Sequence, residues 1–208
     1  MRRRVGLFVW KGGSSPHHPF TLMDNDDLPS PAGQRPANRE DWFTTTPSPW
    51  QEVARLQPDG DRSFATTIER MVMNAEPAQR PELERKLIAA LQQPGITAAG
   101  QLFLCRMLGL IGSPACVAAV RDLLVQEDAS HAARIALDSI DDAAVDAAYR
   151  DALPQLRGAA KCGLIGSIAR RRDQGAIKAL TALALDENEN REVRAAAERA
   201  VEALVAQS

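Results

Sequence analysis

Apolar side chains recur with a helical period along most of the chain from residue 62 onward. In the first two segments they follow the i, i+4, i+7, i+8 spacing that places side chains on one face of an α-helix. These positions are Phe64, Ile68, Met71 and Val72, then Leu83, Leu87, Ala90 and Leu91. The pattern predicts two amphipathic helices in close succession.

A longer period appears beyond Gly95. Apolar pairs spaced by three residues recur at steps of 29 and 28 residues, and a second set follows them at steps of 28 and 32. The first set is Leu108/Ile111, Leu137/Ile140 and Ile165/Ile168, and the second is Val117/Val120, Val145/Ala148 and Ile177/Leu180. This period predicts an internal repeat in which each unit consists of two helices.

Residues typical of helix starts separate the two helices of each unit. Ser113 precedes Pro114, the Asp141-Asp142 pair opens the second unit's second helix, and Asp173 opens the third. A side-chain oxygen at such a position accepts a hydrogen bond from a free N–H group of the first helical turn. Turns this short favour antiparallel packing of neighbouring helices.

Four glycines lie within these helical stretches, at positions 109, 112, 163 and 166. Glycine in a helix interior costs about 1 kcal/mol relative to alanine. We expect the glycines to allow close helix crossings, and the alternative is that they simply end helices.

The composition changes near residue 60. Residues 1–64 hold 7 of the 9 aromatic side chains, whereas residues 65–208 hold 32 alanines. We therefore expect a mostly irregular segment over 1–60 and a helical domain over 61–208, with a short helix near 49–57 that has Ser48 as its N-cap. Trp42, Phe43 and Trp50 are candidates to cover the apolar end of the first helix pair.

The segment Arg191 to Ala200 resembles the first helix of a HEAT-like repeat of the type named after phycobilisome lyases. The segment Leu108 to Leu124 is similar to the turn and second helix of that repeat. The resemblance covers about residues 62–208 and implies an all-α fold, a right-handed α-solenoid of antiparallel helix pairs. Such repeats are specific for a fold and say little about function.

The charge balance limits the classes of partner. Lys and Arg total 25 against 27 Asp and Glu, a formal net charge of −2, which argues against nucleic acid and acidic membranes as partners. No apolar run approaches the length that spans a bilayer. The six apolar residues 5–10 after Arg2-Arg3-Arg4 are too few for a signal peptide, so we expect a cytoplasmic protein.

Candidate catalytic chemistry is sparse. No phosphate loop, dinucleotide fingerprint, nucleophile elbow or zinc-protease motif occurs. His17 and His18 precede Asp24, Asp26 and Asp27 in a Pro/Gly-rich segment that offers no second shell to a metal, and His131 has no evident nucleophile. Cys105, Cys116 and Cys162 lack metal or redox spacing and are expected to be buried, reduced thiols.

One local cluster of charge stands out, formed by Arg170, Arg171 and Arg172 with Arg157 and Lys161 earlier in the same helical unit. Cations at the end of a helix interact favourably with its dipole, which is one interpretation of the cluster. The other is a contact surface for an acidic partner or a phosphate, and these five residues are the candidate partner-binding set.

The function that follows is a scaffold or adaptor without enzymatic activity or cofactor, which binds a protein or peptide. Alternatives are a bilin-lyase-like or other small HEAT-repeat enzyme, or a nucleic-acid-binding HEAT-like protein. The few aromatic side chains after residue 64 do not favour these alternatives.

Overall fold

We describe the fold from a computed structural model of the 208-residue chain, in which residues 48–206 are placed well enough to describe. Every regular element in that range is helical, which confirms the all-α class. The α-helices are α2 (Pro49–Glu52), α3 (Ser63–Met73), α4 (Arg80–Leu91), α5 (Ala98–Ile111), α6 (Val117–Leu124), α7 (Ser130–Leu137), α8 (Ala143–Ala152), α9 (Gly158–Arg171), α10 (Ile177–Leu185) and α11 (Arg191–Val205). Short 3-10 helices are η1 (Val53–Arg55), η2 (Pro77–Gln79), η3 (Pro114–Cys116), η4 (Leu153–Gln155) and η5 (Gln174–Ala176).

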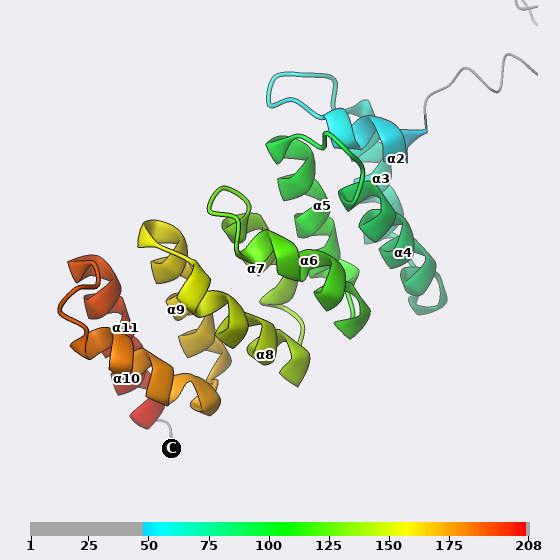
Figure 1. The fold of residues 1–208 in the computed structure, drawn as a ribbon. Helices are drawn as coiled ribbons and strands as arrows, with labels where there is room; N and C mark the ends of the chain where they lie inside the picture. The colour runs from blue at the N-terminus through cyan, green and yellow to red at the C-terminus, as the bar shows by residue number, and fades with distance from the viewer. Residues whose placement is uncertain (1–47, 207–208) are drawn as a thin grey trace, which may run out of the picture. The chain divides into compact units, whose positions relative to one another are not determined.

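The helices contact one another in a regular order (Figure 1). The odd-numbered helices form a first row, in which α3 contacts α5, α5 contacts α7, α7 contacts α9 and α9 contacts α11. The even-numbered helices α4, α6, α8 and α10 form a second row, and each of them contacts the first-row helix that follows it in the chain. Each helix therefore packs mainly on neighbours that are close in sequence.

The apolar pairs that defined the repeat form the core between the two rows. Leu108, Leu137 and Ile165 are almost completely buried on the first-row helices, and Val120, Val145 and Leu180 are buried on the second-row helices. Their burial explains the period, because each unit must place the same apolar positions against its neighbours.

The expected helix starts are confirmed by hydrogen bonds. Ser113 Oγ accepts from the Ala115 N–H group, and the Asp142 carboxylate accepts from the Ala144 N–H group at 2.8 Å. The Asp173 carboxylate accepts from the Gly175 N–H group at 3.0 Å. These caps satisfy donors that the first helical turn leaves free.

The glycines differ in their roles. At Gly109 a Cβ atom would lie 2.7 Å from the carbonyl oxygen of Ile135 on α7, so only glycine lets α5 and α7 approach this closely. A Cβ atom at Gly163 would clash with the Arg134 guanidinium. Gly112 is the C-cap residue that directly follows α5. A Cβ atom at Gly166 would come no closer than 3.9 Å to a neighbouring side chain, so the close-crossing interpretation does not hold there.

The helical part of the chain includes residues before position 61. Helix α2 and η1 together span Pro49–Arg55, close to the expected helix, and Val53 and Ala54 are buried while Trp50 packs partly against the core. Ser48 is the N-cap residue of α2 as expected, but its side chain makes no capping hydrogen bond. Its carbonyl oxygen accepts from the Gln51 N–H group.

Trp42 and Phe43 lie outside the described residues, as do His17 and His18. Within residues 48–206, no helix has the length and apolar character needed to cross a membrane.

Candidate functional site

The five basic candidates belong to the two ends of one helix. Arg157 is the N-cap residue of α9 and Lys161 lies in its first turn, whereas Arg170, Arg171 and Arg172 lie at its C-terminal end. At a rise of 1.5 Å per residue, Arg170 lies about 14 Å from Lys161 and about 20 Å from Arg157 along the helix axis. The structure therefore does not bring the five residues together into one basic patch.

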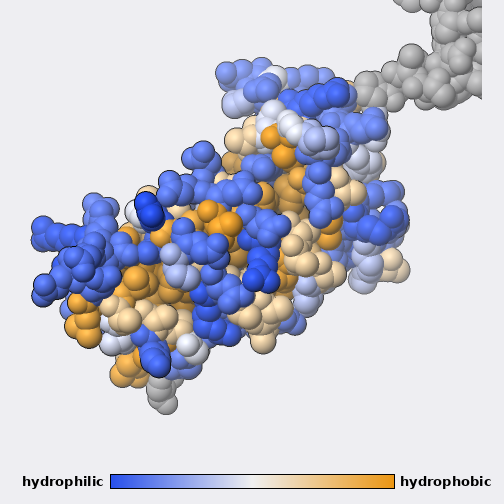
Figure 2. Space-filling view, in the orientation of Figure 1, coloured by the Kyte–Doolittle hydropathy of each residue, from blue (hydrophilic) through white to orange (hydrophobic). Residues whose placement is uncertain are grey.

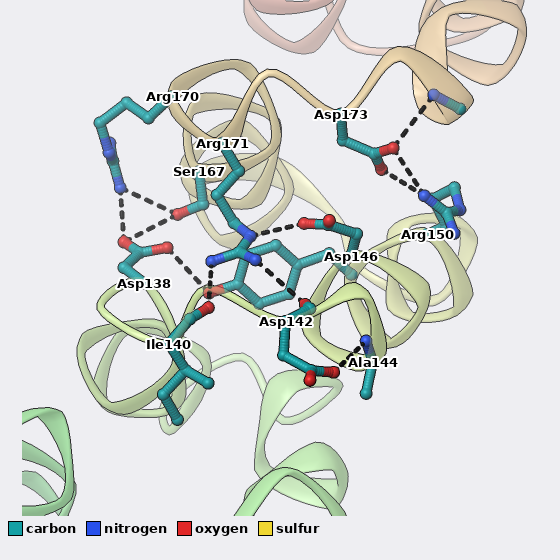
Figure 3. Close-up of polar contacts among 12 residues, drawn as sticks. Asp138, Ile140, Asp142, Ala144, Asp146, Arg150, Ser167, Arg170, Arg171 and Asp173 are labelled. Atoms are coloured by element: carbon teal, nitrogen blue, oxygen red, sulfur yellow. Dashed lines mark hydrogen bonds and ion pairs between the residues drawn. The ribbon is translucent and has the colours of Figure 1, made fainter. Parts of the chain in front are cut away.

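Arg171 is engaged within the chain (Figure 3). Its side chain is only 9% exposed, and its Nε donates to the Asp146 carboxylate at 2.5 Å. Its Nη1 donates to the Ile140 carbonyl at 2.7 Å, and its Nη2 donates to the Asp142 carbonyl at 3.2 Å. The guanidinium carbon lies 6.0 Å from the centre of the Tyr149 ring. Arg171 thus joins α9 to α8 and to the turn before it, and it is not available to a partner.

Asp138 is the centre of a second set of polar contacts beside Arg171 (Figure 3). It accepts hydrogen bonds from Tyr149 Oη at 2.8 Å, from Ser167 Oγ at 3.2 Å and from Arg170 Nη2 at 2.5 Å. Burial, aided by the nearby Asp138 charge, raises the pKa of the Tyr149 hydroxyl well above its usual value. The hydroxyl therefore stays protonated and remains a donor to Asp138 at neutral pH.

Arg134, which the sequence did not single out, connects the first-row helices α7 and α9. From α7, its Nη1 donates to the Gly163 carbonyl at 3.1 Å and to Ser167 Oγ at 3.4 Å. Burial lowers the pKa of this guanidinium, which nevertheless remains charged at neutral pH. The sequence gives only an indirect sign of this role of Arg134: the guanidinium occupies the space that a side chain at position 163 would need, so that position must be glycine.

Lys161 is also engaged within the chain. Its ammonium group lies 2.6 Å from the Glu189 carboxylate, in the loop between α10 and α11, and its side chain is 7% exposed. The hydrogen bond from Lys161, followed by that from the Asn190 N–H group, holds the pKa of Glu189 below its usual value. Lys161 therefore fastens α9 to this loop.

Arg157, Arg170 and Arg172 remain at the surface. The side chain of Arg170 is 63% exposed despite its contact with Asp138. Arg172 follows the last residue of α9 and adopts a left-handed backbone conformation with φ of 60°, which ends the helix.

A shallow hollow of about 330 Å³ lies between α9 and α11 on the first row. Its apolar lining is made mostly of small residues, and Glu192 and Arg199 supply its charges. The lining residues are Cys162, Ile165, Gly166, Ala169, Glu192, Ala196, Arg199 and Ala200. The pKa of the Cys162 thiol is raised, mainly by its partial burial and further by the nearby negative charge of Glu192. Raised thiol pKa values oppose formation of the reactive thiolate.

The remaining candidate chemistry is dispersed in the described part of the chain. His131 is exposed on α7, and its Nδ1 lies 3.4 Å from Arg134 Nη2. Within residues 48–206, no three His, Cys, Asp or Glu side chains are grouped so that they could hold a metal ion. Cys105 and Cys116 are buried as expected, whereas Cys162 is partly exposed.

Comparisons of the chain with family models, with curated proteins and with solved structures give no match. The function of the chain is therefore inferred from the geometry described above.

Proposed function

We propose that residues 48–206 form a right-handed α-solenoid of HEAT-like repeats. The support is a set of polar contacts that recur at the repeat spacing and join one helix pair to the next. Glu84 contacts Ser113 across 29 residues, Ser139 contacts the Gly109 carbonyl across 30, and Lys161 contacts Glu189 across 28. Contacts at a constant sequence separation are what stacked repeats produce.

We infer that this solenoid is a scaffold that binds a protein or peptide rather than an enzyme. The observation that carries the inference is the hollow between α9 and α11, which is open, lined by small apolar residues and bordered by charges of both signs. A partner side chain can bury apolar surface there at little cost in desolvated polar groups. The unpaired thiols of all three cysteines fit a reducing compartment such as the cytoplasm.

The chemistry of the hollow suggests its occupant. The floor at Gly166, Ala169 and Ala196 accepts an apolar side chain, while Arg199 and Glu192 lie where charged residues of the same segment can pair with them. We therefore propose a peptide segment with one large apolar residue that is flanked by an acidic and a basic residue. Arg170 lies beside Gly166 and supplies a further exposed cation for such a segment.

A peptide-display selection on the full chain tests this function. The selected peptides are then titrated against the Gly166→Leu variant, whose new side chain occupies the hollow and meets no close neighbour at its Cβ atom. We expect the selected peptides to share the apolar and charged pattern and to bind this variant at least about tenfold more weakly, a loss of about 1.4 kcal/mol.

The matched control is Ala118→Leu, which adds a leucine to the exposed surface of α6 in the second row. It should leave peptide affinity unchanged, and thermal unfolding should show that both variants are folded. A selection that yields no binder, or binders equally tolerant of Gly166→Leu, contradicts the proposed function.

A further inference from the structure

Large apolar side chains are exposed at the end of the helical part formed by α10 and α11. Leu185, the last residue of α10, is 75% exposed, and Val205, the last residue of α11, is 59% exposed. Figure 2 shows hydrophobic residues at the surface over this end. Helices α10 and α11 contact each other, and α11 contacts α9 on one side.

The repeat shows that the position of Leu185 is buried in another helix pair. Leu153 follows α8 at the position equivalent to Leu185 at the end of α10. The two leucines are 32 residues apart, the same step that separates the repeat positions Val145 and Ile177. Leu153 is 2% exposed, and η4, which contains it, contacts α9. Leu185 stays 75% exposed although α11 follows α10 as α9 follows α8, so its side chain remains available to a docked partner.

The charges on α11 are ordered along the helix. Arg191, Arg194, Glu198, Glu202 and Val205 recur at three- and four-residue spacing, so they share one side of the helix. This side is basic in its first half and acidic in its second half. Among the described residues, none of these four charged side chains is in a salt bridge with another.

When two copies of α11 lie antiparallel, the basic half of each helix faces the acidic half of the other. When two copies of α11 pack across a two-fold axis near Glu198, Arg194 of each copy lies opposite Glu202 of the other. Leu185 lies at the start of α11 in space, because the α10–α11 turn is short, and thus faces Val205 of the other copy. A two-fold interface must use the same surface on both subunits, and this surface meets that requirement.

We propose that a second copy of this chain docks on the α10–α11 end and forms a two-fold symmetric dimer. The interface buries Leu185 and Val205 and pairs Arg194 with the second copy's Glu202, twice in each dimer. Each Glu198 lies near the axis one helical turn from Arg194 of its own chain, which offsets the repulsion between the two glutamates. The dimer leaves the hollow between α9 and α11 outside this interface, and it does not depend on the proposed function.

Sedimentation velocity of the full chain over a range of concentrations tests the dimer. We expect a monomer–dimer equilibrium, and we expect Arg194→Glu and Glu202→Arg each to raise the dissociation constant about tenfold or more, since each removes two ion pairs and adds repulsion. Arg106→Glu, on the exposed surface of α5, is the matched control and should leave association unchanged.

A mixture of the Arg194→Glu and Glu202→Arg variants should restore association. In the mixed dimer the introduced glutamate of one chain faces the introduced arginine of the other on one side of the axis. On the other side, the native Arg194 faces the native Glu202. Both ion pairs are thereby present again, one of them with its charges exchanged.

The apolar contacts are tested by Leu185→Asp, which should also weaken association while thermal unfolding shows that the variant remains folded. A chain that is monomeric at every concentration overturns the proposal. A dimer that survives Arg194→Glu and Leu185→Asp unchanged overturns it too, because association then uses another surface.

Discussion

Arg171 donates a hydrogen bond to the carbonyl oxygen of Ile140, which lies 31 residues earlier in the chain. The last turn of α9 is thereby attached to the turn between α7 and α8 of the preceding unit. The same side chain pairs with Asp146 of the preceding unit's second helix. One residue thus holds three elements of two successive units.

We predict that Arg171→Ala lowers the free energy of unfolding by about 3 kcal/mol, the loss typical of removing one member of a buried ion pair. The Ile140 and Asp142 carbonyls also lose their donor. Urea unfolding measures the change. Arg172→Ala is the control, since that exposed neighbour should change stability by less than about 0.5 kcal/mol. A change in unfolding free energy for Arg171→Ala as small as that for Arg172→Ala would contradict this role of Arg171.

Substitutions at two glycines should change stability in opposite directions. Gly109→Ala places a Cβ atom against the Ile135 carbonyl and should destabilise the protein by about 1 to 3 kcal/mol. Gly166→Ala places a Cβ atom in ordinary contact with the Arg170 side chain at 3.9 Å and should stabilise the protein by about 0.5 to 1 kcal/mol through helix propensity. Thermal unfolding of both variants provides the measurement, and a stabilising Gly109→Ala would refute the close approach of α5 and α7.

The Lys161–Glu189 pair should make stability depend on pH in the acid range. The pKa of Glu189 is lower in the folded chain than its usual value of 4.5, so its contribution is complete above that pH and is lost as pH falls through the folded-state pKa. At pH 7, Glu189→Gln should cost about 1 to 3 kcal/mol, the value of a hydrogen bond to a charged group. Denaturant unfolding at neutral and acid pH should show the difference from the wild type shrinking in acid; a constant difference would contradict this origin.

The three cysteines should differ in reactivity. Burial raises the pKa of the Cys105 thiol to about 12 and that of Cys116 to about 11, whereas Cys162 is partly exposed at the α9–α11 hollow. A thiol reagent should modify Cys162 alone in the folded protein and all three in urea. Cys162→Ser should abolish the reaction of the folded protein. Rapid modification of three thiols without denaturant would contradict the burial.

The basic cluster marks a limit of sequence reasoning. The run Arg170-Arg171-Arg172 suggested three equivalent surface cations, yet the Arg171 side chain is almost buried while its neighbours are exposed. Consecutive residues on a helix point about 100° apart, so a run of one residue type divides among different environments. Which of them meets Asp146 depends on how α9 lies on α8.

The sequence by itself determined the helices of the repeat, the caps at Ser113, Asp142 and Asp173, and the identity of the core. Helical periodicity and cap chemistry are local properties, and burial of the same apolar positions in each unit leaves a period that can be counted along the chain. Only the tertiary structure decided that Arg134 lies across Gly163, that Lys161 meets Glu189, and that α9 and α11 leave a hollow between them. Those contacts join residues about 30 positions apart, and their geometry depends on the packing distance between helices, which no local pattern specifies.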